Sequence, residues 1–259
     1  MTYTEPAGPI RIERHPGVAR IVFQRPAQGN ALDLAMARET LAALRAAEAD
    51  PTVHVLSLTG AGRFFCAGGD VHGIAEHLPA HRPRYLRELA TAAHDLALAI
   101  VRSRLIAVAG VNGAAAGAGL GLLLVSDWVL VAENAPLVAA YSTIGLTPDT
   151  GVSYLLPRAV GHQRAVDLTL NGRRLTGAEA VEWGLANQSV PAADFTERLT
   201  QVEDGFLQGA VHALGPTKRL LRAPVIQELE THLLAETDSI AELSAHPGSV
   251  DLLDRFANG

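Results

Sequence analysis

The chain has 259 residues, of which 48% are hydrophobic, and this length and composition allow one sizeable core. The formal charge of −6, with Lys218 as the one lysine among 21 basic residues, argues against nucleic acid as a partner. A single cysteine, Cys66, excludes an internal disulfide, and the first 20 residues lack the apolar stretch of a secretory signal, so we expect a cytoplasmic protein.

The first predicted elements alternate between strand and helix. Residues 18–23 form an apolar strand, and Asp33 is then the predicted N-cap of a helix. The apolar positions of this helix, at spacings of three and four residues, are Leu34, Ala37, Leu41 and Leu44. The helix stops at Pro51, and a second strand is predicted over residues 53–59.

A glycine-bearing turn, residues 64–70, follows the second strand and leads toward a helix that Asp70 is expected to cap. After a segment with several histidines and prolines, residues 72–83, we predict a helix over residues 84–102. Its apolar stripe consists of Leu86, Leu89, Ala93, Leu96 and Ile100. His94 lies on the flank of that stripe.

Residues 105–132 are almost entirely apolar, with Asp127 as the one charged side chain among 28. The length would suit a membrane span, but clustered glycines together with Asn112 and Asp127 argue against a single helix in lipid, and no membrane contact is expected. We predict a strand over 105–111, a turn at Asn112, a helix over 117–125 and a further strand. A helix start with almost no side chains can approach a ligand closely and favours an anion.

The next segment, residues 137–144, precedes a loop with glycine and proline, residues 145–151. From Val152 onward the pattern is helical. Thr176 and Glu179 have the spacing of a capping box at the start of one of these helices.

The core is expected to end near residue 190, which divides the chain into residues 1–190 and a helical region of residues 191–259. Breaks in the helical region are predicted at Gly215-Pro216 and at Pro247-Gly248. Amphipathic helices of this kind suit an appendage or an oligomer surface.

The two glycine turns, residues 64–70 and 113–119, are the main chemical clue. When the carbon next to a thioester carbonyl loses a proton an enolate forms, and a pair of fixed N–H donors stabilises its oxygen. Small residues are needed there so that the backbone itself can reach this oxygen. The alternative is that both turns only allow close packing in an α/β protein.

Other functional motifs are missing from the sequence. No G-x-G-x-x-G follows a strand, and neither G-x-x-x-x-G-K-[ST] nor G-x-S-x-G is present. Pro79 separates His77 from His81 and no third ligand is nearby, so no metal site is expected. Cys66 lies in an apolar run without a partner histidine, which favours a packing role.

Several ordered blocks carry a resemblance to a known family. They are Gln24-Arg25-Pro26 with Asn30-Ala31-Leu32, Thr59-Gly60-Ala61-Gly62 with Phe65-Cys66-Ala67-Gly68-Gly69-Asp70, and Val111-Asn112-Gly113 with Gly117-Ala118-Gly119. These blocks resemble the signatures of the enoyl-CoA hydratase/isomerase (crotonase) superfamily, and the resemblance covers roughly residues 10–190. Within the superfamily, the chain is most similar to the isomerase branch, such as ring-epoxyphenylacetyl-CoA and enoyl-CoA isomerases.

The resemblance implies an α/β fold with a core of ββα turns arranged as a spiral and a helical C-terminal region that assembles homotrimers, often paired into hexamers. It implies an acyl-CoA thioester as substrate, with coenzyme A as part of the substrate and no separate cofactor. The oxyanion donors are then the backbone N–H groups of Gly69 and Ala118. The residues that it places at the substrate are Arg25, Ala27, Ala31, Ala67, Gly68, Asp70, Val71, Gly117 and Tyr141. Family members commonly carry a lysine near Ala27 and basic residues in the last dozen positions, whereas Ala27 is neutral here; Arg25, Arg63 or Arg255 of a neighbouring subunit is then the candidate for the CoA phosphates.

The acidic residues distinguish this chain from the hydratases of the family. Hydratases hold a water between two glutamates, at positions that correspond here to Gly121 and Tyr141. Asp149 follows Pro148 where family isomerases carry an aspartate, and one carboxylate fits a 1,3-proton shift because the same base can remove a proton and return it. The alternative, which the residues alone would favour, is that Asp149 merely shapes a Pro-Asp turn.

Other activities remain open from the sequence. The 4-chlorobenzoyl-CoA dehalogenase branch is similar through Asp149 and His94 but has a tryptophan at the position of Tyr141. Hydrolytic dehalogenation or a related thioester hydrolysis is therefore the alternative to isomerisation, with His94 as a second catalytic residue. A hydratase with another acid/base set and an acyl-CoA binder without catalysis are further alternatives.

Overall fold

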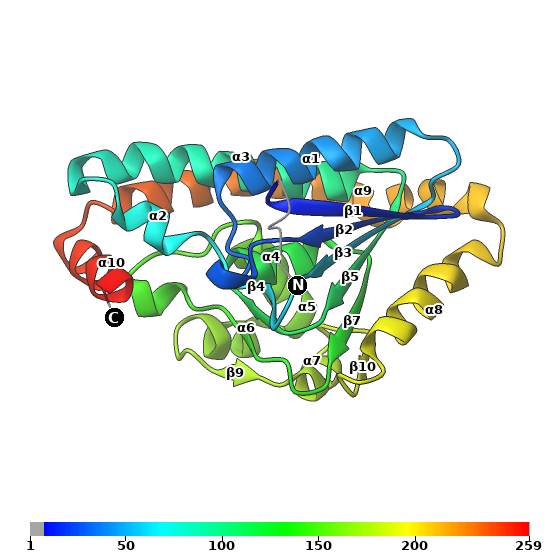
Figure 1. Ribbon diagram of the computed structural model, residues 1–259. Helices are drawn as coiled ribbons and strands as arrows, with labels where there is room; N and C mark the ends of the chain where they lie inside the picture. Colours follow the sequence, from blue (N-terminus) through cyan, green and yellow to red (C-terminus); the bar gives the residue numbers. More distant parts are fainter. Residues whose placement is uncertain (1–7, 259) are drawn as a thin grey trace, which may run out of the picture.

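The structure, a computed structural model, describes residues 8–258. Ten strands in this range form two sheets (Figure 1). The larger sheet has the order β1 (Ile10–His15), β2 (Val18–Phe23), β3 (Val55–Gly60), β5 (Ile106–Val111), β7 (Trp128–Ala132) and β10 (Gln188–Val190), with β1 antiparallel and the rest parallel. The smaller sheet has the order β4 (Phe64–Cys66), β6 (Ala114–Ala116), β8 (Leu137–Val138) and β9 (Arg174–Leu175). The predicted lack of a secretory signal concerns residues 1–20, of which residues 1–7 lie outside the described range.

Consecutive strands pass from the larger sheet to the smaller one. The pairs β3 and β4, β5 and β6, and β7 and β8 each contribute one strand to each sheet. Helices α2 (Val71–Ala75), α4 (Ala118–Val125) and α5 (Val152–Val160) follow these pairs. This repeated path confirms the predicted ββα spiral, in which β4 and β6 occupy the stretches that the sequence indicated only as turns.

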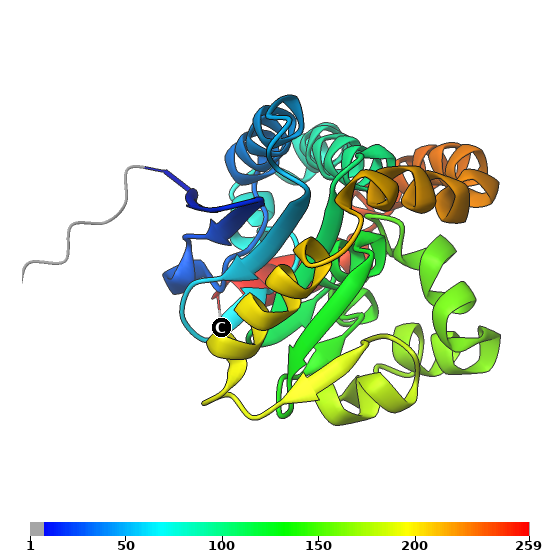
Figure 2. The same cartoon turned by 90° about the vertical axis from the view of Figure 1, so that its right-hand side faces the viewer.

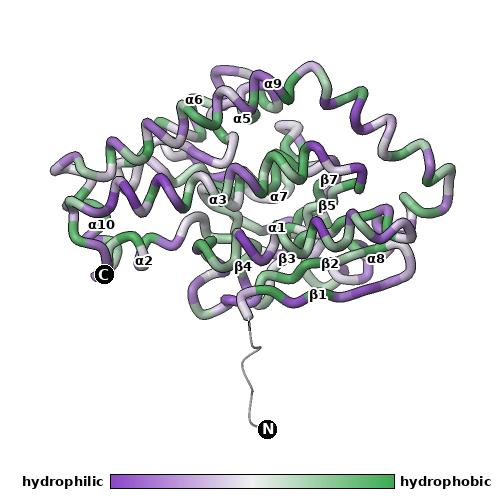
Figure 3. The backbone as a smooth tube through the Cα atoms, turned by 90° about the horizontal axis from the view of Figure 1, so that it is seen from above, coloured by the Kyte–Doolittle hydropathy of each residue, from purple (hydrophilic) through white to green (hydrophobic). Residues whose placement is uncertain are grey.

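Three long helices lie side by side along one face of the larger sheet (Figure 2). They are α1 (Leu34–Ala49), α3 (Arg82–Arg102) and α9 (Val211–Leu243). Asp33 caps α1 as predicted, because its side chain accepts a hydrogen bond from the Met36 N–H at 2.7 Å. The predicted apolar stripe of α3 is buried, and the outer helices alternate between hydrophilic and hydrophobic residues along their length (Figure 3).

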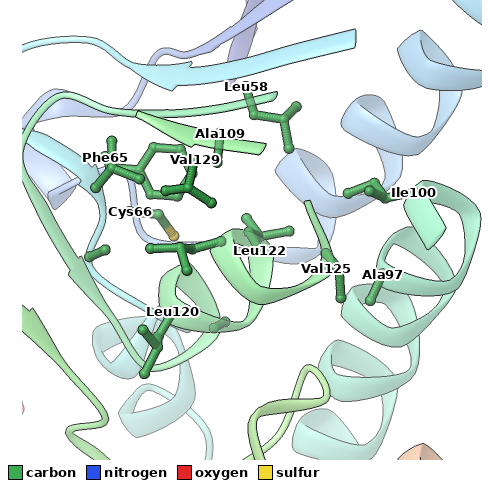
Figure 4. Packing of buried hydrophobic residues seen from close by; sticks show 14 of the residues in the cluster. Leu58, Phe65, Cys66, Ala97, Ile100, Ala109, Leu120, Leu122, Val125 and Val129 are labelled. Carbon is green, nitrogen blue, oxygen red and sulfur yellow. The ribbon is translucent and has the colours of Figure 1, made fainter. Parts of the chain in front are cut away.

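Helix α4 is the centre of the core and explains the apolar composition of residues 105–132. Its side chains pack against Leu58, Phe65 and Val129 of the sheets, and against Ala97 and Ile100 of α3 (Figure 4). A Cβ on Gly119 would lie 2.2 Å from the Cys66 carbonyl oxygen, so glycine lets α4 approach β4. Within residues 8–258, none of the helices has the length and apolar character that crossing a membrane requires.

Of the remaining helices, α6 (His162–Thr169) packs on α5, α7 (Gly177–Glu182) contacts β10, α8 (Phe195–Leu207) contacts β3 and β7 of the larger sheet, and α10 (Pro247–Asn258) packs on α2. Short 3-10 turns lie at Pro26–Gln28, Pro79–His81 and Tyr141–Ile144. The predicted capping box of α7 is present, since Thr176 and Glu179 bond each other's backbone N–H. The break at Pro247 is confirmed as the start of α10.

The predicted break at Gly215-Pro216 is wrong, because α9 continues through both residues. A Cβ on Gly215 would lie 2.9 Å from the Arg104 carbonyl oxygen, so glycine permits close packing at this point. In the next turn, the buried Lys218 ammonium donates to the carbonyl oxygens of Ile100 and Leu105 at 2.8 and 2.7 Å. These tertiary contacts stabilise the helix despite its proline. The division of the chain near residue 190, and a role of the C-terminal helices in trimers, stay predictions.

Candidate active site

The two glycine turns meet at a small cavity of about 40 Å³. Five of the predicted site residues line it: Gly69, Val71, Ala118, Tyr141 and Asp149. The rest of the lining is apolar and consists of Leu32, Ile74, Leu86, Leu89, Ala93, Ile144, Leu146 and Ile240. An apolar pocket with a few polar groups converging on it is the usual form of a small-molecule site.

The backbone of the two turns is arranged for close approach. Gly68 has φ +105° and Gly117 has φ +50°, and a Cβ on Gly117 would lie 3.4 Å from the Gly68 Cα. The next residues, Gly69 and Ala118, both line the cavity. Ala118 is the first residue of α4, so its N–H has no acceptor within the helix. Hydrogen bonds among residues 8–258 use neither N–H, which leaves both free for an oxyanion.

Asp149 is the one acidic residue among the described residues that line the cavity. The Tyr141 hydroxyl donates to its Oδ1 at 2.7 Å, and the Thr150 hydroxyl donates to the same oxygen at 3.1 Å. Among residues 8–258, both hydrogen bonds to the Asp149 carboxylate are made to Oδ1. Oδ2 is therefore available to a group in the cavity. Asp149 is 8% exposed, and its carboxylate is therefore shielded from bulk water.

Tyr141 is a hydrogen-bond donor here and not a base. Burial, and next the negative charge of Asp149, raise the pKa of its phenol well above the usual value. The hydroxyl consequently keeps its proton at neutral pH and holds the Asp149 carboxylate in place.

Gly121, one of the two positions where hydratases of the family carry glutamate, has no room for a side chain. A Cβ at this position would lie 2.6 Å from the Thr150 Cβ and 2.7 Å from the Thr150 carbonyl oxygen. Thr150 therefore occupies the space that a glutamate would need. The packing of α4 against the loop that carries Asp149 depends on glycine at this position.

Replacing Gly121 by alanine is expected to destabilise the protein by about 1–3 kcal/mol and to lower any activity that depends on Asp149, because the added methyl group displaces Thr150. Urea unfolding and turnover of an acyl-CoA substrate measure the two effects. Gly205→Ala is the matched control, since its Cβ meets no atom within 4 Å in helix α8 and we expect a neutral effect or a gain of about 0.5–1 kcal/mol. Equal stability of the Gly121 variant and the wild type would contradict the packing account.

His94 lies beside the Asp149 loop and is not among the residues that line the cavity. Its Nε2 accepts the Thr150 N–H at 3.0 Å, and its Nδ1 lies 2.9 Å from the Thr237 hydroxyl oxygen. The side chain is buried, and burial lowers the pKa of the imidazole against the opposing effect of Asp149 and Asp95.

The other predicted substrate contacts lie outside the cavity lining. The Arg25 guanidinium bonds the Asp70 carboxylate at 2.7 Å and also donates to the Ala31 carbonyl oxygen. Asp70 accepts the Gly73 N–H at 3.0 Å and thus caps α2 as predicted. Ala27 and Ala67 are exposed, whereas Gly68 and Gly117 form the turns themselves.

Cys66 is fully buried, and burial raises the pKa of its thiol to about 11. The thiol is therefore protonated at neutral pH and inert as a nucleophile, in agreement with the predicted packing role. Among residues 8–258, histidine, cysteine and acidic side chains nowhere gather in a group that could hold a metal ion.

Two residues of the site, Glu236 and Ile240, were not predicted from the sequence. Glu236 is buried beside the Asp149 loop, and burial raises its pKa to about 7. It accepts the Gly151 N–H at 2.8 Å although 85 residues separate the two. Ile240, on the same helix, reaches the cavity wall. Contacts between residues so far apart in sequence depend on how α9 packs.

The ββα spiral is the fold of crotonase-type acyl-CoA-processing enzymes. The sequence model of the enoyl-CoA hydratase/isomerase family matches residues 13–256, and the chain belongs to this family.

Similar proteins are named for different activities. A 4-chlorobenzoyl coenzyme A dehalogenase-2 from an Arthrobacter species is 31% identical, with 95% of this chain and 90% of the relative covered. The 1,2-epoxyphenylacetyl-CoA isomerase of Escherichia coli is 33% identical, with 86% of this chain and 85% of the relative covered. A crystal structure of an enoyl-CoA hydratase from Mycobacterium avium subsp. paratuberculosis has a TM-score of 0.87 and 32% identity, and covers 98% of this chain and 97% of its own.

Proposed function

We propose that the protein is an enoyl-CoA isomerase that moves a double bond by a 1,3-proton shift. The observation that carries this proposal is the single carboxylate in the described lining of the cavity, Asp149, which lies with the free N–H groups of Gly69 and Ala118. The reaction needs no cofactor besides the coenzyme A of its substrate.

In the proposed reaction, a 3-enoyl-CoA binds with its thioester oxygen at the two N–H groups. The Asp149 carboxylate removes a proton from C2, the electron pair of the C2–H bond forms a C1–C2 double bond, and the carbonyl electrons move onto the thioester oxygen to give a dienolate. The two N–H donors stabilise this dienolate oxygen. The Asp149 carboxylic acid then returns the proton to C4, the C2–C3 double bond forms, and the product is 2-enoyl-CoA. No atom is gained or lost.

Water addition is less well supported by the same geometry. A hydratase needs groups that both activate water and protonate the neighbouring carbon. Here Thr150 fills the space beside Gly121, and Tyr141 is a donor to Asp149. The apolar wall also offers few partners for a bound water.

The proposal is tested by incubating the purified protein with 3-enoyl-CoA and, separately, with 2-enoyl-CoA, and by following both by mass and by absorbance of the conjugated thioester. We expect conversion of 3-enoyl-CoA to its conjugated isomer at constant mass and no water adduct of 2-enoyl-CoA. A gain of one water by 2-enoyl-CoA, undiminished in Asp149→Asn, would overturn the proposal in favour of a hydratase.

Hydrolytic dehalogenation of an aryl-CoA, or a related thioester hydrolysis, is the second candidate. It is supported by the similarity to the Arthrobacter dehalogenase and by the contact of His94 with the residue after Asp149. In that reaction the Asp149 carboxylate would displace chloride from the aromatic ring to form an aryl ester, and His94 would activate the water that hydrolyses this ester. Halide release from 4-chlorobenzoyl-CoA that is lost in both His94→Gln and Asp149→Asn would promote this candidate.

A further inference from the structure

The turn after Asp149 has a backbone conformation that requires support. Thr150 has φ +55° and Gly151 has φ +81°. Glycine adopts such angles easily, but in a β-branched residue the left-handed region is strained and persists only where the surroundings hold it. The direction of the Asp149 side chain depends on this turn.

Two buried side chains from distant helices hold the turn by its N–H groups. His94 of α3 accepts the Thr150 N–H at 3.0 Å through Nε2. Glu236 of α9 accepts the Gly151 N–H at 2.8 Å through Oε2 and the Ser153 N–H at 3.0 Å through Oε1. Both acceptors are at most 5% exposed, so these bonds do not compete with water.

The hydrogen bonds of His94 define its tautomer. Because Nε2 accepts an N–H it carries no proton, and the ring proton is therefore on Nδ1. This N–H faces the Thr237 hydroxyl oxygen at 2.9 Å, while the Thr237 hydroxyl donates to the Leu233 carbonyl oxygen at 3.1 Å. Both ring nitrogens are thus occupied, which leaves the ring without a lone pair for a proton from water or substrate.

We propose that His94 is a positioning residue that holds the Thr150–Gly151 turn together with the Glu236 hydrogen bonds, and that His94 transfers no proton during catalysis. Oδ1 of Asp149 is held by Tyr141 and Thr150, and the backbone that carries Asp149 is held by His94 and Glu236. The kinetic part of this inference rests on the proposed isomerase function.

The test compares His94→Gln with His94→Met. The glutamine carbonyl oxygen can replace Nε2 as acceptor of the Thr150 N–H, whereas methionine has a similar size and lacks that acceptor. We expect His94→Gln to keep kcat for 3-enoyl-CoA within a few-fold of wild type, and His94→Met to lose about 10- to 100-fold in kcat with little change in KM, because small displacements of a reacting group are costly.

Amide hydrogen exchange at Thr150, whose N–H is bonded to His94, gives a readout that is independent of activity. Exchange is expected to accelerate in His94→Met and to stay near wild type in His94→Gln. Thr237→Val is a second variant in case His94→Met does not fold. It removes the acceptor of the Nδ1 proton and should accelerate exchange at Thr150 to a smaller extent.

The outcomes separate the inference from the proposed function. If His94→Gln is as inactive as His94→Met while Thr150 exchange is normal, His94 takes part in chemistry and the inference fails. Unchanged Thr150 exchange in both His94→Met and Thr237→Val also refutes it. If the wild type isomerises no enoyl-CoA but the exchange pattern is as expected, the proposed function fails and the positioning role stands.

Discussion

Replacing Asp149 by asparagine is expected to lower kcat for isomerisation of 3-enoyl-CoA by roughly 10²- to 10⁴-fold, the usual contribution of a positioned general base. The amide cannot accept the C2 proton, yet its oxygen can still accept the hydrogen bonds that Tyr141 and Thr150 donate to Oδ1. The loop should therefore keep its conformation, and the affinity for a saturated acyl-CoA, measured by calorimetry, should be unchanged.

Tyr141→Phe is the matched control for this variant. It removes one hydrogen bond to Asp149 and leaves the carboxylate in place, so we expect a loss of about tenfold, corresponding to roughly 1.4 kcal/mol. An Asp149→Asn enzyme that isomerises at the wild-type rate, with unchanged acyl-CoA affinity, would show that another group is the base.

Replacing Ala118 by proline is expected to lower kcat by roughly 10²- to 10³-fold, as is typical when one oxyanion donor is lost. Proline has no N–H, and at the first position of a helix no intrahelical hydrogen bond depends on that N–H. Ala118 is the first residue of α4, and the variant therefore removes the donor while α4 keeps its own hydrogen bonds.

Ala118→Gly is the control, since it keeps the N–H and changes only a methyl group. We expect its kcat to stay within a few-fold of wild type. Circular dichroism and urea unfolding check that both variants fold. Full activity of a folded Ala118→Pro enzyme would exclude the Ala118 N–H as an oxyanion donor.

Local sequence signals predicted the elements that local interactions stabilise. The predicted strand at residues 18–23 is confirmed, and Asp33 and Thr176 cap helices as predicted. The short strands β4 and β6 were not predicted, because three residues carry too little periodicity. The break at Gly215-Pro216 was wrong because packing against Arg104 and the hydrogen bonds of Lys218 outweigh the local effect of proline.

The candidate site was predictable where small residues mark a backbone role. The glycine turns indicated a pair of backbone donors, and the resemblance indicated Gly69, Ala118, Asp149 and Tyr141; the structure brings all four residues to one cavity. The support behind Asp149 was not predictable, because Glu236 contacts the turn only through the packing of α9. The left-handed backbone conformation of Thr150 could not be predicted from the sequence either, since threonine rarely adopts it.

The most direct test of the central claim, that Asp149 alone carries the proton between C2 and C4, uses 3-enoyl-CoA with two deuterium atoms at C2 in ordinary water. We predict 2-enoyl-CoA with deuterium at C4, detected by mass and NMR, because the shielded carboxylic acid returns part of the label that it removed. Asp149→Asn should form almost none of this product. Product that has gained a water, or labelled product formed equally fast by Asp149→Asn, would contradict the account.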